Sequence, residues 1–184
     1  MLKVSGTDLD NLSVISTQTL ADKRGQFTRL FCQEELRKLL ADRDIKQVNH
    51  SSTVQAGSVR GMHFQYPPKA EGKFVRCIRG RVFDVAIDIR RNSKTFLQWY
   101  GCELSDRNRT MIFIPEGFAH GFQTLGDNCE MLYLHTEFYS ASHEGAIRFD
   151  DPKVNIEWPL EMTHASDRDR QHPFLAADFN GIEI

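Results

Sequence analysis

The sequence predicts an all-β fold, a jelly-roll barrel with one short N-terminal helix and C-terminal loops that wrap around it. The first observation is a series of short strand candidates at fairly even spacing, separated by turn residues. The second is the segment RVFDVAIDIR (residues 81–90), whose apolar and polar residues alternate with the period of two typical of a strand. The third is the scarcity of helical patterns, because only residues 33–42 space leucines at i, i+3 and i+4.

In chain order, the helix over residues 33–42 comes first and presents Leu36, Leu39 and Leu40 on one face. The strand candidates then span residues 46–53, 58–65, 73–79, 81–90, 96–104, 110–114, 120–125 and 130–138. After Tyr139, phrases rich in Asp, Asn and Pro, such as residues 149–159, predict loops and edge segments rather than a second domain.

The strand at residues 81–90 has one apolar and one polar face. Its apolar face, which we expect to pack against a second sheet, consists of Phe83, Val85, Ile87 and Ile89. Asp84 lies on the opposite face, which in a barrel wide enough for a ligand can line the interior. Asp84 is therefore either a pocket residue or a solvated surface acid.

Length and composition predict one domain, residues 1–184, that binds neither nucleic acid nor a membrane. A chain of 184 residues with 40% apolar content can bury a single core. The net charge is −2, with acids and bases spread along the chain, which does not favour a nucleic-acid groove or an anionic membrane surface. The four cysteines match no zinc or CxxC spacing, and no secretory signal pattern is present, so we expect a reduced, cytoplasmic protein.

Two motifs have the spacing of the paired metal-binding motifs of a cupin barrel. They are Gly57-x5-His63-x-Gln65…Lys73-x6-Gly80 and Pro115-x-Gly117-x2-His120. Gln65 and Lys73 stand where the pattern has a His and a Glu, and an ammonium repels a divalent cation and cannot ligate it. The sequence therefore predicts a cupin-type barrel without a metal. A fixed positive charge can still stabilise a developing oxyanion, which favours enolate chemistry beside a carbonyl.

Further candidate site residues lie on the predicted strands at residues 58–65 and 130–138. His63 and Gln65 share a face, and Arg60 can reach an anionic group beside them. Tyr133, His135 and Glu137 would likewise share a face, where a buried tyrosine can act as a general acid. Tyr139 can present a flat ring for stacking on a base. Each of these residues alone is more often structural, so the chemistry depends on their joint pattern.

Seven phrases, which extend over nearly the whole chain, carry a family resemblance. They are DKRGQF (22–27), QVN (47–49), the segment 58–96, IPEGFAHGF (114–122), YLHTEFY (133–139), DDPKVNIEWP (150–159) and SDRD (166–169). In this order they resemble the dTDP-4-dehydrorhamnose 3,5-epimerase family, which has a cupin fold. The resemblance implies a homodimer without metal or cofactor that epimerises a nucleotide-linked 4-keto-6-deoxy sugar, by removing and returning protons beside the ketone.

The resemblance also implies roles for individual residues. His63 looks like the general base, Asp169 like the carboxylate that orients it, Lys73 like the group that stabilises the enolate oxygen, and Tyr133 like the acid on the opposite face. A histidine is a base close to neutral pH, which suits removal of a proton beside a ketone once a cation faces the oxygen. The positions associated with substrate binding are Arg24, Gln47, Asn49, Arg60, His120, Glu144 and Arg168, with Tyr139 stacking on the nucleotide base.

Two residues depart from the family pattern. Arg29 stands where the phrase RGxFxE has its Glu, and Leu134 replaces the Lys of YKTT. If that Glu contacts the nucleotide, Arg29 would be a substrate-binding residue of opposite charge, able to donate to the acceptors of cytosine. The hypothesis that follows is a CDP-linked substrate and inversion at C5 alone, as in the pathway to ascarylose.

The sequence leaves other functions open. A 3,4-ketoisomerase or a single-carbon epimerase would also use a His base and an enolate, and the sequence does not decide whether C3, C5 or both are inverted. A non-catalytic cupin that binds a sugar nucleotide would leave Lys73, Tyr133 and the His63–Asp169 pair without a joint purpose. A metal-dependent oxygenase is disfavoured, because only His63 and His120 of the ligand set are present.

Overall fold

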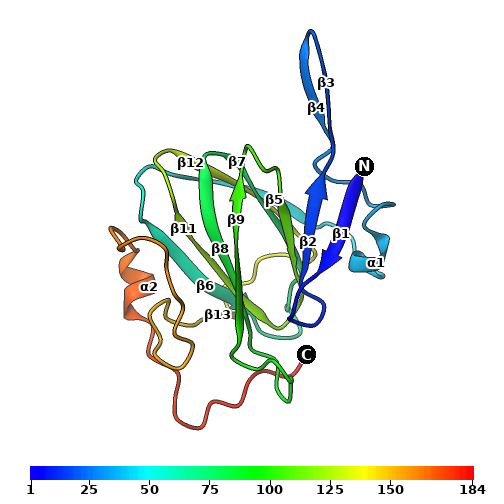
Figure 1. Cartoon of the computed structure of the whole chain (residues 1–184). Helices are drawn as coiled ribbons and strands as arrows, with labels where there is room; N and C mark the ends of the chain where they lie inside the picture. The colour runs from blue at the N-terminus through cyan, green and yellow to red at the C-terminus, as the bar shows by residue number, and fades with distance from the viewer.

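The computed structural model describes residues 1–184 and consists of two antiparallel sheets that form a barrel, with a separate two-stranded hairpin (Figure 1). The larger sheet has the order β1 (Leu2–Gly6), β2 (Ser13–Thr17), β10 (Met111–Ile114), β7 (Lys73–Arg79), β12 (Cys129–His135) and β5 (Gln47–Thr53). The smaller sheet has the order β13 (Glu144–Ala146), β6 (Val59–Gln65), β11 (Phe118–Thr124), β8 (Arg81–Asp88) and β9 (Trp99–Ser105). The hairpin pairs β3 (Thr19–Asp22) with β4 (Gly25–Thr28). The two sheets confirm the predicted all-β jelly-roll barrel.

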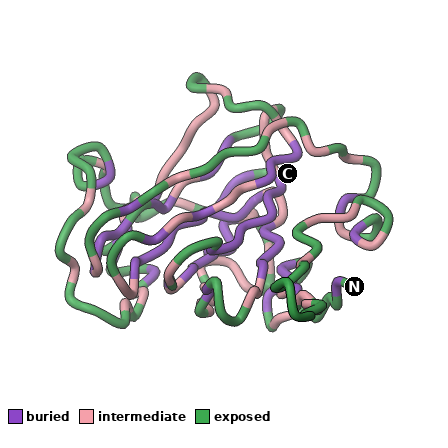
Figure 2. The backbone as a smooth tube through the Cα atoms, turned by 90° about the horizontal axis from the view of Figure 1, so that it is seen from above, coloured by how far each residue is buried: buried purple, intermediate pink, exposed green.

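Three apolar clusters hold this architecture together. The first lies between the sheets, where Val75 and Ile112 of the larger sheet meet Ala86 and Phe122 of the smaller one. The second lies on the outer face of the smaller sheet, and the third lies on the outer face of the larger sheet beneath the segment that contains α1 (Arg37–Leu40). Figure 2 shows the result, with buried backbone concentrated in the barrel strands and exposed backbone in the surrounding loops.

The two faces of β8 are divided as the alternation predicts, but the covering layer differs. Asp84 is fully buried and turns toward the barrel interior. The apolar face packs against the C-terminal segment, including Ile147 and Trp158, and not against a second sheet as the sequence predicted. The C-terminal loops thus cover the apolar face of β8 and bury it from water, so no further sheet is needed on that side.

All eight strand candidates are present, with ends displaced by at most three residues. The helix expected over residues 33–42 is much shorter, because only Arg37–Leu40 is helical. Its N-cap, Leu36, has no side-chain acceptor for the first N–H groups, and Ala41 adopts a φ of +51° that ends the helix. Leu36 and Leu40 are nevertheless buried on the predicted face.

The strand and helix candidates do not include β1 to β4, β13 or the short helix α2 (Asp167–Gln171). Strands β1, β3 and β4 are exposed along most of their length, so their sequences lack the regular apolar alternation that identifies a strand. All four cysteines are free thiols. No helix of the structure is long and apolar enough to span a membrane.

Candidate active site

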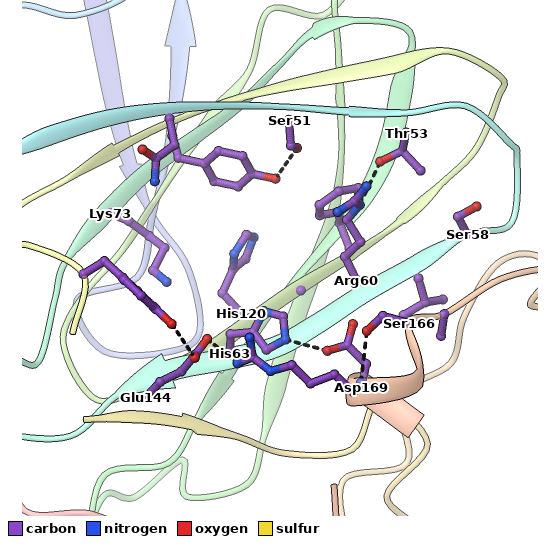
Figure 3. Close-up of a pocket in the computed structure, with 18 of the residues that line it drawn as sticks. Ser51, Thr53, Ser58, Arg60, His63, Lys73, His120, Glu144, Ser166 and Asp169 are labelled. Atoms are coloured by element: carbon purple, nitrogen blue, oxygen red, sulfur yellow. Dashed lines mark hydrogen bonds and ion pairs between the residues drawn. The ribbon is translucent and has the colours of Figure 1, made fainter. Parts of the chain in front are cut away.

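A cavity of about 670 Å³ opens at one end of the barrel and is lined mainly by polar side chains. Its walls come from both sheets and from the loop before α2, which the close-up in Figure 3 brings together. Ten of the predicted site residues line it: Asn49, Arg60, His63, Lys73, His120, Tyr133, Tyr139, Glu144, Arg168 and Asp169. Such a convergence of polar groups in one concave site is typical of a catalytic pocket.

His63 and Asp169 form a pair at the wall made by β6. The Nε2 atom of His63 lies 2.7 Å from Oδ1 of Asp169, whose side chain is only 5% exposed. Burial opposes ionisation of Asp169, but the hydrogen bond from His63 outweighs it and lowers the pKa of the carboxyl group. Because a carboxylate can only accept, Nε2 donates and Nδ1 of the neutral ring keeps its lone pair. His63 is therefore held as a base with a fixed tautomer.

Local sequence explains where Asp169 lies. Ser166 is the N-cap of α2, and its Oγ accepts the backbone N–H of Asp169 at 3.0 Å. The short helix is thereby anchored so that the carboxylate of its third residue faces β6, as Figure 3 shows.

Lys73 begins β7 and is paired with a carboxylate that the sequence reading did not select. Its Nζ lies 2.7 Å from Oε1 of Glu71, and both side chains are at most 10% exposed. The other oxygen of Glu71 lies 2.8 Å from Nδ1 of His135. Burial alone would raise the pKa of Glu71, but Lys73 and His135 lower it to about 2. The cavity thus contains the amino group of Lys73 next to an ionised carboxylate.

Tyr133 lies on β12, in the sheet opposite His63. Its hydroxyl is 3.0 Å from Oγ of Ser51, and its ring meets the ring of His120 edge-on with centroids 6.3 Å apart. Burial raises the pKa of the phenol well above its usual value, although Ser51 acts in the opposite direction. Tyr133 therefore keeps its proton at neutral pH and can act only as a donor of that proton.

His120 is fixed by Asp84, the buried acid of β8. Its Nε2 lies 2.9 Å and 3.1 Å from the two carboxylate oxygens. In the β11–β6 ladder, His120 is also the register partner of His63, so both histidines reach the same part of the cavity. The alternative that Asp84 is a solvated surface acid is excluded, since it has no exposed surface.

The rim of the cavity carries a second polar group. Tyr139 donates to Glu144 at 2.9 Å, and Glu144 also pairs with Arg168 at 2.5 Å. Burial opposes ionisation of Glu144, but the bonds from Arg168 and Tyr139 lower its pKa. Arg60, on β6, donates to Oγ1 of Thr53. The rim therefore presents two guanidinium groups and one exposed phenol ring.

Three predicted substrate-binding residues do not line the cavity. Gln47 instead accepts the backbone N–H of Tyr139 at 3.0 Å and so supports the rim from behind. Arg24 lies in the turn of the β3–β4 hairpin, where it pairs with Asp22 and its side chain is 90% exposed. Arg29 forms an ion pair with Glu35 of its own chain.

Two other predictions can be compared with the geometry. Gln65, which stands at a cupin metal-ligand position, bonds to the backbone of Lys69, Phe138 and Ser140 and fixes the loop after β12. Leu134 points to the outer cluster of the larger sheet, so this departure from the family pattern leaves the cavity unchanged. Glu71 was not predicted, because its role depends on its contacts with both Lys73 and His135, and no sequence motif marks it.

An acid–base isomerase built on a cupin barrel is the class that this fold and this cavity define. The family model described as dTDP-4-dehydrorhamnose 3,5-epimerase matches residues 6–177. The chain accordingly belongs to the dTDP-4-dehydrorhamnose 3,5-epimerase family.

Individual relatives agree with this assignment. The chain is 44% identical over 167 residues to the dTDP-4-dehydrorhamnose 3,5-epimerase of Methanothermobacter thermautotrophicus, with 89% of each chain covered. It is 40% identical over 183 residues to that of Sinorhizobium fredii, with 94% of each covered. A crystal structure of dTDP-6-deoxy-D-glucose-3,5-epimerase from Legionella pneumophila, in complex with dTDP-4-keto-L-rhamnose, superposes with a TM-score of 0.91 at 34% identity and covers all of both chains. By name, none of these relatives is a ketoisomerase, an oxygenase or a non-catalytic cupin.

Proposed function

We propose that this protein epimerises a dTDP-4-keto-6-deoxyhexose at C3 and C5 by way of an enolate. The observation that carries the proposal is the placement of a base and an acid on opposite walls of one cavity. His63 extends from the smaller sheet and Tyr133 from the larger one, with the Lys73 ammonium in the same cavity. Inversion at carbon requires removal of a proton from one face and its return to the other, which two walls can perform.

In the proposed step, Nδ1 of His63 takes the proton from the carbon beside the ketone. The C–H electron pair forms a carbon–carbon double bond, and the ketone oxygen becomes an oxyanion that the Lys73 ammonium stabilises. The imidazolium formed on His63 pairs with Asp169 at 2.7 Å. Tyr133 then gives its hydroxyl proton to the opposite face of the carbon, and the ketone re-forms. The imidazolium of His63 loses its extra proton to water and the phenolate of Tyr133 takes one from water, so the same pair can act on the second carbon.

The rim groups suit a nucleoside diphosphate. Arg60 and Arg168 offer guanidinium groups that can bind phosphate oxygens, and the exposed ring of Tyr139 can stack on a base. The relatives named above carry dTDP in their names, and the guanidinium of Arg29 is already paired with Glu35 of its own chain. We therefore propose dTDP rather than CDP as the nucleotide.

A homodimer is part of the proposal, and the β3–β4 hairpin supports it. The hairpin projects from the barrel in Figure 1, and Leu20 and Phe27 on it are 62% and 66% exposed. Apolar side chains on such a projection favour contact with another protein surface. Arg24, at the hairpin turn, does not line the cavity of its own chain, so it can contact a substrate only in the cavity of a second copy.

Deuterium exchange tests the reaction directly. The protein is incubated with dTDP-4-keto-6-deoxyglucose in D2O, and the label is located by NMR. We expect label at both C3 and C5 in the wild type, none with His63→Ala or Lys73→Ala, and exchange without inversion with Tyr133→Phe.

Other outcomes would exclude parts of the proposal. Label at C5 alone would exclude double epimerisation, and tight binding without any label would indicate a non-catalytic cupin. Faster turnover of the matched CDP sugar would overturn the choice of nucleotide. Wild-type exchange in His63→Ala or Lys73→Ala would refute the assigned roles.

A further inference from the structure

His172 lies directly behind the His63–Asp169 pair and has no part in the chemistry described so far. It is the C-cap of α2, three residues after Asp169, and one of its ring nitrogens lies within 4.8 Å of the ligand atoms of His63 and Asp169. Its Nε2 is buried and has no hydrogen-bond partner. A buried imidazole nitrogen that bonds to no other protein group has its lone pair free to bind an ion or a water molecule.

The surroundings of that nitrogen favour a metal ion. His63, Asp169 and His172 each offer one ligand atom, and the three atoms lie within 4.8 Å of one another. Two imidazoles and a carboxylate are a donor set that suits zinc and related transition metals, and it is a poor set for magnesium. A tetrahedral zinc ion holds its ligand atoms roughly 3.3 Å apart, so the widest pair would have to close by up to about 1.5 Å and the His63–Asp169 pair, now at 2.7 Å, would have to open by about 0.6 Å.

We propose that His63, Asp169 and His172 form a binding site for zinc, and that bound zinc prevents His63 from accepting a proton from the substrate. The site differs from the metal position of the cupin motifs, because Asp169 and His172 come from the C-terminal segment and neither lies in those motifs. His63 is 36% exposed toward the cavity, which provides a route for the ion.

The inhibitory effect follows from the tautomer of His63. In the metal-free protein, Nε2 carries the ring proton and donates it to Asp169, which leaves Nδ1 as the base. A metal on Nε2 takes the place of that proton, and the single proton of the neutral ring then resides on Nδ1. The ring can no longer accept a proton from the substrate. Because the ion lies on the Asp169 side of the ring, the nucleotide sugar can still bind, so kcat falls while KM does not change.

Metal binding and inhibition are tested separately, because only the inhibition rests on the proposed epimerase reaction. The full chain is treated with chelator, then titrated with ZnCl2 by calorimetry, and each form is also assayed for deuterium exchange. We expect one zinc ion per chain, loss of exchange in proportion to occupancy, and unchanged binding of dTDP. MgCl2 should produce neither heat nor inhibition.

Two variants of His172 and one control decide the site. His172→Ala and His172→Gln should weaken zinc binding at least tenfold and keep exchange activity in the presence of zinc. His143→Ala, which removes a histidine outside the group, should bind zinc as the wild type does. Wild-type zinc affinity in both His172 variants, or inhibition that raises KM instead of lowering kcat, would overturn the proposal. Absence of exchange in the zinc-free wild type would instead contradict the proposed function and leave the binding result intact.

Discussion

Replacing Glu71 by glutamine removes the carboxylate that neutralises Lys73 inside the barrel. Despite burial, Lys73 and His135 lower the pKa of Glu71 from 4.5 to about 2. One pKa unit corresponds to 1.36 kcal/mol, so the ionised carboxylate contributes about 3 kcal/mol to stability at neutral pH. Removing one partner of a buried ion pair costs about 3–5 kcal/mol. Glutamine still offers an oxygen acceptor to the neighbouring groups, so we expect a loss near the lower end of that range.

The pH dependence of this loss is fixed by the sign of the shift. Because the folded-state pKa of Glu71 is lowered, its contribution is complete above pH 4.5 and is lost as the pH falls toward 2. The difference in the free energy of unfolding between wild type and Glu71→Gln should therefore be about 3 kcal/mol at pH 7 and about 2 kcal/mol at pH 3.5.

Urea unfolding at a fixed protein concentration measures both values. Glu137→Gln is the matched control, because Glu137 pairs with Lys69 at 3.4 Å near the surface and should contribute less than about 1 kcal/mol. Equal losses for the two variants at pH 7, or a Glu71→Gln difference that grows as the pH falls, would show that the buried pair does not stabilise the fold as described.

Three further substitutions address the base, the backbone and the hairpin. Asp169→Asn should lower kcat by roughly 100-fold or more with little change in KM, because the amide cannot pair with an imidazolium; steady-state kinetics that show a change in KM alone would contradict this. Gly61→Ala should cost at least about 2 kcal/mol in urea unfolding, because Gly61 has a φ of +129° and an added Cβ would lie 2.5 Å from the Cα of Gly121. Gly126→Ala, with nothing within 4 Å of the added Cβ, is its control, and equal losses would refute the steric argument. Arg24→Ala should raise KM, because Arg24 is proposed to contact the substrate in the cavity of a second copy, and should leave the urea midpoint unchanged. An unaltered KM would show that Arg24 does not bind the substrate.

The barrel could be predicted because its strands are buried on one or both faces. The alternation in β8 and the apolar run in β7 reflect that burial directly, so their bounds agree closely with the sequence patterns. The hairpin and β1 could not be predicted in this way, since their side chains are mostly exposed and no burial pattern constrains them. The helix is shorter than the predicted range of residues 33–42, because buried leucines alone do not supply the capping groups that a longer helix requires.

The site was predictable where a spacing motif or a family phrase marked the residue. His63, Lys73 and His120 lie in the cupin-type motifs, and they do line one cavity. Glu71, Ser51 and His172 could not be selected, because their importance depends on which strands are neighbours and on where α2 docks. Pairing between β5 and β12 brings Ser51 to Tyr133, and no short sequence pattern encodes that pairing.

The counter-charges in the cavity determine when the proposed catalytic groups gain their interactions. Glu71 holds Lys73 at 2.7 Å before any substrate arrives, so the amino group needs no reorganisation when negative charge develops on the ketone oxygen. Asp169 accepts only a neutral N–H in the resting state and gains a full ion pair once His63 takes the proton. The attraction between Lys73 and the ketone oxygen and the attraction between Asp169 and the His63 imidazolium are therefore strong in the transition state and weak in the ground state. Interactions with that property accelerate a reaction, whereas equal binding of substrate and transition state does not.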